Sequence, residues 1–202
     1  MENEKVLEKV YKASIKLLVP QTIEETFKIV VNEAMKLVDG DYGTILLSTN
    51  GKLERVYTSH QLLSSFSPRK RGLTYRAFKT NKPFIPVFID VQKAHPELSK
   101  LSVKSDIMIP LSYQNQAYGV LTILSKKQDH FNKTHLAILK LFGPLATLAI
   151  KKTQYFEETK QALDTRDLFI SLASHELKTP LTTVYAYTQL LQKKIDKGEN
   201  LK

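Results

Sequence analysis

The 202-residue sequence contains no cysteine and only 7 glycines. Without cysteine the chain can form neither disulfides nor thiolate metal sites, and it cannot carry a thioether-linked chromophore. No apolar run approaches the roughly 18 residues of a membrane span, and no charged-then-apolar leader opens the chain. No glycine-rich phosphate loop is present either. We therefore expect a cytoplasmic protein without a membrane span that does not bind ATP through such a loop.

The formal net charge of +10 raises the question of a nucleic-acid partner. The lysines are scattered along the chain and alternate with acidic residues, and the densest basic cluster is Arg69-Lys70-Arg71. Such a cluster is typical of a solvated loop, so we expect no nucleic acid among the partners. Nucleic-acid binding stays open as a third hypothesis, which predicts salt-sensitive binding to DNA or RNA.

Two helices are predicted at the N-terminus. Residues 1–19 form an amphipathic pattern that Pro20 stops. Thr22 and Glu25 have the spacing of a capping box and open the next helix. That helix ends at Asp39-Gly40, where glycine is suited to a left-handed position.

Two hairpins are predicted in the middle of the chain. Residues 44–49 and 53–58 are β-prone and are joined by Asn50-Gly51, a strong signal for a two-residue turn. The second hairpin pairs residues 107–113 and 117–125 across a turn at 114–116. Between the hairpins we expect a helix, a strand, and a loop with a helical turn, at 73–80, 84–87 and 90–101 respectively. This order of elements predicts an α+β fold, an antiparallel sheet with flanking helices.

A long helix is predicted from Lys133 to about Lys194. Apolar residues recur in it every seven positions, at Phe142, Ala149, Phe156, Leu163, Ile170 and Leu177. The neighbouring seam runs through Leu145, Lys152, Thr159, Arg166 and Ala173, and three of these five residues are polar. This pattern predicts a coiled-coil signalling helix of limited stability that joins two copies into a homodimer. The alternative is a long helix that lies against its own domain. Gly143-Pro144 predicts a kink.

The segment 174–182, SHELKTPLT, lies within this helical pattern. His175 falls outside the apolar stripe of the helix, so its ring should face water or a partner. An imidazole is neutral near pH 7 yet basic enough to attack a phosphoryl group. A carboxylate such as Glu176 can act as general base for the second ring nitrogen. Thr179 lies one turn further along the same face, and Pro180 removes a backbone N–H and should bend the helix.

The motif in 174–182 resembles the phosphoacceptor motif of histidine protein kinases, and the likeness extends over about 165–192. This resemblance implies that His175 is the phosphoacceptor, Glu176 its general base, and Thr179 a residue that positions water for dephosphorylating the partner. It also implies transfer of the phosphoryl group to an Asp of a response-regulator receiver domain. ATP and Mg are then expected in a catalytic domain that this chain lacks, and no cofactor or metal is expected in the chain itself.

Residues 105–111, 118–121 and the helix after Phe131 resemble the C-terminal half of GAF domains, and residues 72–90 resemble the segment before it. The resemblance implies a GAF-like sensor at 20–150, between an N-terminal helix at 1–19 and a truncated connecting and phosphoacceptor helix at 151–202. GAF domains bind small molecules or serve in dimerisation, and the ligand here is unknown. Five aromatic residues could line a cavity or fill the core: Tyr57, Phe66, Tyr75, Phe78 and Tyr118. The alternative function is a non-enzymatic GAF module for dimerisation or ligand binding, with an inert His motif.

Overall fold

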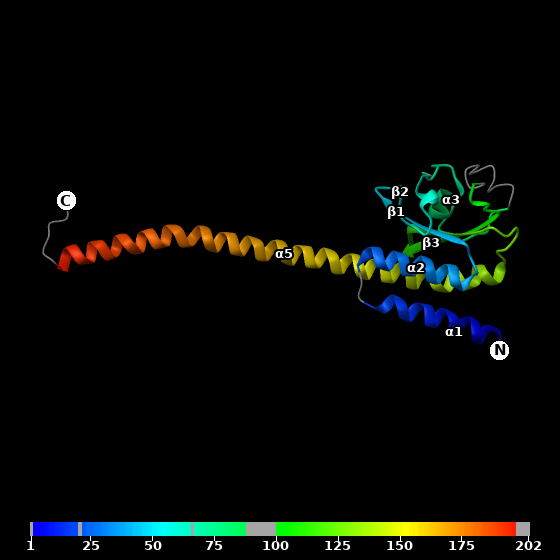
Figure 1. Cartoon of the computed structure of the whole chain (residues 1–202), viewed down its shortest axis with the longest axis horizontal. Coiled ribbons are helices and arrows are strands. Elements are labelled where there is room, and N and C mark those ends of the chain that lie inside the picture. The colour runs from blue at the N-terminus through cyan, green and yellow to red at the C-terminus, as the bar shows by residue number, and fades with distance from the viewer. Residues whose placement is uncertain (1, 20–21, 66, 88–99, 197–202) are drawn as a thin grey trace. The chain divides into compact units, whose positions relative to one another are not determined.

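The computed structural model describes all residues except 1, 20–21, 66, 88–99 and 197–202. The chain divides into two compact units, Met1–Tyr155 and Phe156–Lys202. The first unit contains the sheet and most of the helices (Figure 1). The second consists, in its described part, of the C-terminal portion of one helix.

The sheet has four strands, all paired antiparallel in the order β2-β1-β4-β3. Their bounds are Tyr42–Thr49 for β1, Lys52–Thr58 for β2, Ser105–Tyr113 for β3 and Gln116–Ser125 for β4. Both predicted hairpins are confirmed. Asn50 and Gly51 both have positive φ angles, as a two-residue turn that follows the strand twist requires. The second turn uses only Gln114 and Asn115, also at positive φ, because Gln116 already pairs with Tyr113.

The helices lie where the sequence pattern indicates. Their bounds are Glu2–Ile15 for α1, Ile23–Leu37 for α2, Leu73–Thr80 for α3 and Lys133–Asp196 for α5, with short 3-10 turns η1 at Lys16–Leu18 and η2 at Gln61–Ser65. The predicted strand at 84–87 is wrong, since only Phe84 pairs, as a single bridge to Met108. Most of the predicted loop at 90–101 lies outside the described residues.

The start of α2 is fixed by the predicted capping box. The Thr22 hydroxyl accepts a hydrogen bond from the Glu25 backbone N–H, and the Glu25 carboxylate accepts one from the Thr22 N–H. The end of the helix differs from the expectation, because Asp39 rather than Gly40 adopts the left-handed conformation. Gly40 is needed for space instead, since a Cβ there would lie 2.2 Å from the Ile123 side chain.

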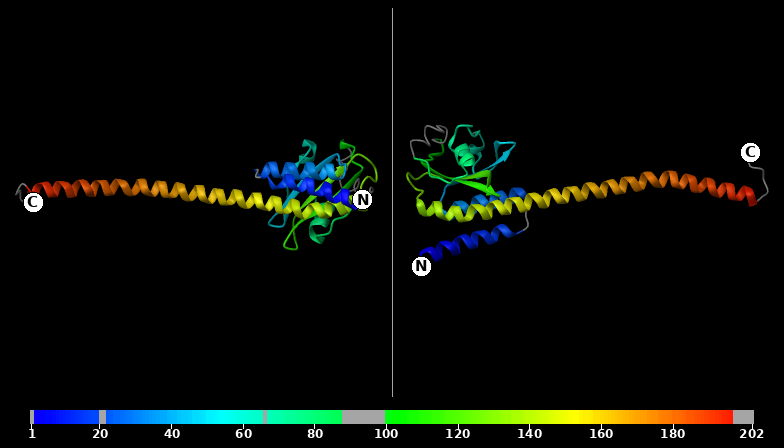
Figure 2. Two further views of the ribbon diagram at one scale, coloured as in Figure 1. Left: turned by 90° about the horizontal axis from the view of Figure 1, so that it is seen from below. Right: turned by 180° about the vertical axis from the view of Figure 1, so that it is seen from behind.

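The first unit is layered. Figure 1 shows α2 and the first turns of α5 on one face of the sheet and α3 on the other, and the right view in Figure 2 places α1 beyond the α2/α5 layer. The main core fills the space between the sheet and α2/α5, and Val10, Ala13 and Leu17 attach α1 and η1 to it. Two other apolar side chains of α1, Leu7 and Tyr11, are exposed.

Helix α5 continues without interruption through Gly143-Pro144. Gly143 is required by close packing, because a Cβ there would lie 2.9 Å from the Ile109 side chain of β3. By length and composition alone, α5 contains a window apolar enough to cross a membrane, with mean hydropathy 1.2 and 44% of it buried inside the fold. Leu139, Phe142 and Ile150 of this helix are fully buried in the core of the first unit.

Candidate functional site

His175 projects from α5 in the second unit. Its side chain is 80% exposed, and that of the adjacent Glu176 is 84% exposed. One carboxylate oxygen of Glu176 lies 3.8 Å from Nδ1 of His175. The imidazole is therefore oriented with Nδ1 toward a carboxylate, and Nε2 is the ring nitrogen farther from it. This arrangement suits an imidazole that reacts through Nε2 while the proton on Nδ1 stays close to a base.

Thr179 lines the same shallow helix face as His175, one turn further along. Its hydroxyl donates to the His175 carbonyl at 3.5 Å, at the limit of hydrogen-bonding distance. Thr182 and Thr183 donate in the same way to the carbonyls of Lys178 and Thr179, at 2.7 and 3.1 Å. Such back-bonding favours helix bending, and these bonds surround Pro180, whose missing N–H leaves a gap in the helix ladder. The ribbon of the second unit curves in its orange stretch (Figure 1).

The heptad series divides between two environments. Phe142 and Ala149 are buried in the core of the first unit. The later members are 46–64% exposed: Phe156, Leu163, Ile170 and Leu177. The alternative of a helix lying against its own domain therefore holds for the first turns of α5. The exposed apolar series begins at Phe156.

A second exposed apolar surface lies in the first unit, where α1 and η1 face α5. It is a groove of about 220 Å³ with an almost wholly apolar lining. The groove is formed by Tyr11, Ser14, Ile15, Leu17, Leu18, Leu145, Leu148, Ala149 and Lys152. We call this surface the α1/α5 groove. Leu145 and Lys152 belong to the second heptad series of the long helix, the one that polar residues interrupt. This second series therefore contributes to an exposed face.

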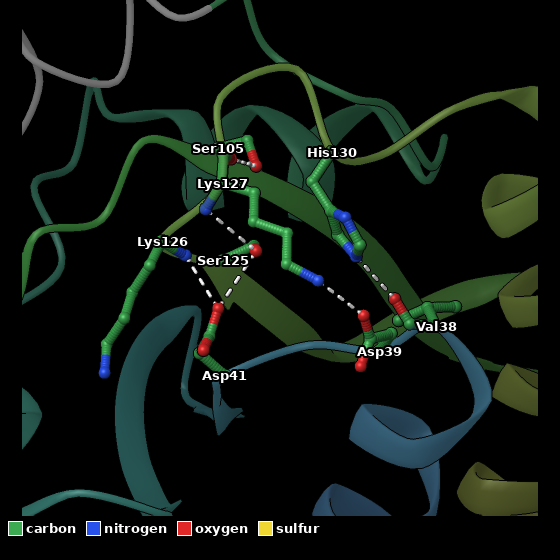
Figure 3. A network of polar contacts seen from close by, with 8 residues as sticks. All are labelled: Val38, Asp39, Asp41, Ser105, Ser125, Lys126, Lys127 and His130. Carbon is green, nitrogen blue, oxygen red and sulfur yellow. Dashed lines mark hydrogen bonds and ion pairs between the residues drawn. The ribbon is translucent and has the colours of Figure 1, made fainter.

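A polar network fixes the start of α5 (Figure 3). Asp41 accepts hydrogen bonds from the Ser125 hydroxyl at 3.0 Å and from the Lys126 backbone N–H at 2.7 Å. The Lys127 ammonium lies 2.8 Å from a carboxylate oxygen of Asp39. His130 Nε2 lies 2.9 Å from the Val38 carbonyl oxygen. These contacts tie the segment between β4 and α5 to the turn between α2 and β1.

Asn132 caps the start of α5, because its side chain accepts a hydrogen bond from the His135 backbone N–H at 3.0 Å. The rings of His130 and His135 lie 5.2 Å apart. Burial, and then the proximity of His130, lower the pKa of His135. The network holds the segment before α5 to the domain, and it was not anticipated from the sequence because its partners are far apart along the chain.

The sheet face beneath α3 carries a band of polar residues. Side chains alternate between the two faces of a strand, and Ile45, Ile107 and Leu121 point into the main core. On the opposite face the apolar residues form two separate clusters, one containing Met108 of β3 and the other Leu124 of β4.

Four residues, one from each strand, lie between or beside those clusters: Thr44, Arg55, Asp106 and Thr122. We call them the distal polar band. Thr44 pairs directly with Thr122, and Asp106 is the diagonal neighbour of Thr122 across the β3–β4 ladder. Arg55 pairs with Leu46 beside a β-bulge, and so reaches the same face from the edge strand β2.

Polar atoms of this band are buried without hydrogen bonds. Among the described residues, five buried side-chain atoms lack a partner, and four of them belong to the band: Arg55 Nε and Nη1, Asp106 Oδ1 and Thr122 Oγ1. Asp106 is 2% exposed, and burial raises its pKa to about 7. On the other side of the sheet, the buried carboxylate of Glu33 receives ammonium groups from both Lys16 and Lys36.

The aromatic residues predicted for a cavity or the core lie in the core where the structure describes them. Tyr75 packs in the cluster beneath α3, with Phe78 beside it, and its hydroxyl accepts from the Leu53 N–H. Tyr57 and Tyr118 pack against the main core; Phe66 lies outside the described residues. Within the described part of the chain, no group of three or more His, Cys, Asp or Glu side chains could hold a metal ion.

Comparisons with known proteins match both parts of the chain. The family model described as GAF domain matches residues 20–151, and the model described as His Kinase A (phospho-acceptor) domain matches residues 165–202. No curated protein matches the chain.

Among solved structures, the chain is similar to the GAF domain of a phosphoenolpyruvate-protein phosphotransferase from Coxiella burnetii. That likeness has 15% identity and a TM-score of 0.65, and covers 76% of this chain and 96% of the other. The chain is also similar to the GAF domain of a two-component sensor histidine kinase from Bacillus halodurans. Here the identity is 20% and the TM-score 0.54, with 64% of this chain and 97% of the other covered.

These two likenesses agree with the four-stranded antiparallel sheet and its flanking helices, and at such identities they bear on the fold alone. The GAF match covers well over half of the 202 residues, and it is followed along the chain by the phosphoacceptor match. The chain therefore belongs to the GAF domain family, and its GAF domain precedes a HisKA segment, the combination found in a portion of a sensor histidine kinase.

Proposed function

We propose that this chain is the sensory and phosphoacceptor portion of a two-component sensor histidine kinase, and that His175 receives the phosphoryl group. The observation that carries the proposal is the exposed imidazole beside a carboxylate, within a segment that matches the phosphoacceptor family. An acceptor in a relay must reach two different partners in turn, and an 80% exposed side chain permits both encounters.

In the proposed reaction, the lone pair of His175 Nε2 attacks the γ-phosphorus of ATP. The bond from that phosphorus to the bridging oxygen breaks, and ADP leaves with the electron pair. The proton on Nδ1 becomes more acidic as the new P–N bond forms, and Glu176 accepts or stabilises it. An Asp of a response-regulator receiver domain then takes the phosphoryl group from Nε2, which regains its lone pair.

ATP and its Mg²⁺ would be bound by a separate catalytic domain. Such a domain would have to position the γ-phosphoryl group, because in phosphoryl transfer most of the catalysis is positioning and electrostatic stabilisation. We assign Thr179 the secondary role of positioning water when the response regulator is dephosphorylated. Its hydroxyl is free to do so at small cost, since its bond to the His175 carbonyl is long at 3.5 Å.

We further propose that the chain acts as a cytoplasmic homodimer through α5. Two exposed apolar surfaces support this, the series that begins at Phe156 and the α1/α5 groove. A second copy would cover both with like side chains, because a symmetric dimer uses the same surface on each subunit. HisKA domains imply dimerisation in histidine kinases, which favours a second copy over an unrelated partner.

The phosphoryl-transfer test uses the whole chain, a separately purified histidine-kinase catalytic domain and ATP labelled at the γ-phosphate. We expect an acid-labile label on the wild type and none on His175→Gln. His60→Gln, which changes a histidine of the first unit, is the matched control and should be labelled normally. Glu176→Gln should slow labelling by about 10²-fold, the range of general-base assistance.

A label that persists in His175→Gln would exclude His175 as the acceptor. No labelling of the wild type, combined with intact dimerisation in His175→Gln, would instead favour the alternative function. In that alternative the chain is a non-enzymatic GAF module with an inert His motif, and the exposed apolar surfaces alone are functional.

A further inference from the structure

The excess positive charge of the chain is concentrated in one stretch of the first unit. Residues 55–89 contain seven Lys and Arg and no Asp or Glu. This stretch therefore carries +7 of the net charge of +10. It also contains four of the five arginines of the chain. Elsewhere basic and acidic residues nearly balance, so the charge that distinguishes this protein has a definite place in the fold.

Six of these seven cations are exposed and lie in and around α3. We call them the α3 basic surface: Arg69, Lys70, Arg71, Arg76, Lys79 and Lys82. The first three precede the helix, where the Gly72 N–H donates to the Arg69 carbonyl at 2.7 Å. Arg76 and Lys79 lie three residues apart on the solvent side of α3, because Tyr75 and Ala77 pack into the core. An eight-residue helix is about 12 Å long, so the six charges are confined to a short distance.

The α3 basic surface is not neutralised within the described part of the chain. Among the described residues, no ion pair joins any of its six side chains to a carboxylate. Other lysines of the same unit are paired, as Lys16 and Lys36 are with Glu33. The Arg76 guanidinium lies 5.0 Å from the centroid of the Phe84 ring, a contact that orients it and leaves its charge in place. Clustered like charges repel each other, so this surface is suited to an external polyanion.

The position of α3 keeps this surface accessible. Figure 1 shows α3 on the sheet face opposite α2 and the first turns of α5. The α1/α5 groove, which we assign to the homodimer, is lined by residues of α1, η1 and α5. A second copy seated on that groove would therefore leave the α3 basic surface open to another partner.

The side chains of this region distinguish between classes of polyanion. Single-stranded nucleic acids are bound on exposed aromatic side chains that stack with bases. In the described part of residues 55–87 no aromatic side chain is exposed, and the face of Phe84 is already covered by Arg76. The centre of a protein–protein interface is depleted in charged residues and enriched in aromatic ones. The α3 basic surface has the opposite composition.

A lipid bilayer is the partner that fits these features. Clusters of about four to eight Lys and Arg bind anionic lipids, whose mobile headgroups need no fixed pattern of contacts. Arginine in particular forms paired hydrogen bonds with phosphate groups. Leu62 and Val87, on either side of the cluster along the chain, are exposed apolar residues that could contact the boundary between headgroups and acyl chains.

We infer that the α3 basic surface binds the anionic headgroups of a lipid bilayer, so that the first unit attaches peripherally to a membrane. The attachment is electrostatic and reversible, and it needs no membrane span. The inference goes beyond the proposed phosphoryl relay and is independent of it, because neither His175 nor the segment around it takes part.

The test is cosedimentation of the whole chain with vesicles of phosphatidylcholine, prepared with and without phosphatidylserine. We expect binding only where phosphatidylserine is present. Binding should disappear as the salt concentration rises from about 0.1 M to 1 M, because the Debye length falls from about 10 Å to about 3 Å.

Variants of the surface give the decisive comparison. The triple variant Arg69→Gln/Lys70→Gln/Arg71→Gln should bind about 10²-fold more weakly, since each Lys or Arg near an anionic bilayer contributes a factor of about five. Arg76→Gln/Lys79→Gln should weaken binding by about 30-fold on the same basis. All five substituted side chains are exposed, and circular dichroism checks that the variants are folded.

The matched control removes three exposed lysines from the helices on the other side of the sheet: Lys28→Gln/Lys133→Gln/Lys140→Gln. It loses the same net charge as the first triple variant and should bind vesicles nearly as tightly as the wild type. His175→Gln should also bind like the wild type. Failure of phosphoryl transfer and failure of membrane binding are therefore separately visible.

The inference is overturned if the wild type does not bind phosphatidylserine vesicles at about 0.1 M salt. It is equally overturned if the control variant loses as much affinity as the Arg69/Lys70/Arg71 variant, because net charge rather than this surface would then be responsible. Fluorescence anisotropy with duplex DNA and single-stranded RNA tests the competing partner. Nucleic-acid binding that this triple variant abolishes, without binding to vesicles, would assign the surface to nucleic acid instead.

Discussion

Helix α5 places similar apolar side chains in opposite environments. In the first unit, Phe142 is fully buried between the helix and the sheet. In the second unit, Phe156 and Phe169 are 64% and 70% exposed. The sequence pattern around them is much the same, so periodicity alone does not decide which residues are buried. What differs is the presence of a partner surface within the same chain.

This difference separates two uses of an apolar stripe. In the first unit the stripe stabilises a domain, and its loss should unfold that domain. In the second it remains available for another polypeptide, and its loss should affect association. Contiguous exposed apolar surface is uncommon in monomeric soluble proteins, which is why the second unit is the one that we expect to need a second copy.

The sharpest test of this comparison replaces one phenylalanine of α5 at a time by alanine. Phe142→Ala should lower the free energy of unfolding of the first unit by about 3–5 kcal/mol, because it removes a fully buried aromatic side chain. Phe156→Ala, on the same helix, should change that energy by less than about 0.5 kcal/mol but weaken dimerisation. Urea unfolding followed by circular dichroism measures the first effect, and sedimentation equilibrium the second. Equal losses of stability in the two variants would break the comparison.

The second test uses a buried carboxyl of the first unit. The folded pKa of Asp106 is raised to about 7 by burial, whereas its unfolded value is about 3.9. Its contribution to stability is therefore fully present below about pH 3.9 and is lost as the pH rises toward 7. The difference amounts to roughly 4 kcal/mol.

Asp106→Asn should flatten this part of the stability profile between pH 4 and 8. Glu176→Gln, at an exposed carboxylate of the second unit, should leave the profile as it is in the wild type. The lowered pKa of His135 acts in the opposite sense, because stability is lost as the pH falls below about 6.5. The same denaturation measurements across this pH range, repeated in a chain with His135→Gln, separate the titration of Asp106 from that of His135. An unchanged slope in Asp106→Asn would show that Asp106 is ionised normally.

The smallest expected effect concerns the capping box of α2. Thr22→Ala removes the hydroxyl that accepts from the Glu25 N–H and should lower stability by about 1 kcal/mol. The matched change in the second unit is Thr165→Ala, where the hydroxyl bonds only to the Gln161 carbonyl of its own helix. That variant should leave domain stability unchanged, since alanine favours a helix interior. Thermal unfolding of both variants checks the difference.

Much of the fold could be predicted from local signals. Asn50-Gly51 marked the first hairpin and Thr22 with Glu25 marked the start of α2, because these residues act on their immediate neighbours along the chain. The role of Gly40 at the end of α2 was predicted wrongly, because it does not depend on neighbours along the chain. Its role depends on Ile123, a residue far away in the sequence.

The His175 motif and the distal polar band also differ in whether their residues are neighbours in the sequence. The motif around His175 could be recognised in the sequence because its residues are adjacent, and its roles remain predictions until phosphoryl transfer is measured. The distal polar band could not be recognised, because Arg55, Asp106 and Thr122 come from three strands. Only the strand register brings their side chains to one face.

The sequence by itself determined the α+β class, the helix that carries His175 and the side chains next to it, since these follow from turns, caps and helical spacing. The tertiary structure decided which part of α5 is buried, and it assembled the polar network at the start of that helix and the polar band across the sheet. The physical reason is that burial and hydrogen-bond satisfaction depend on the surfaces that meet in space. A helical stripe or an isolated aspartate has no fixed environment until the fold supplies one.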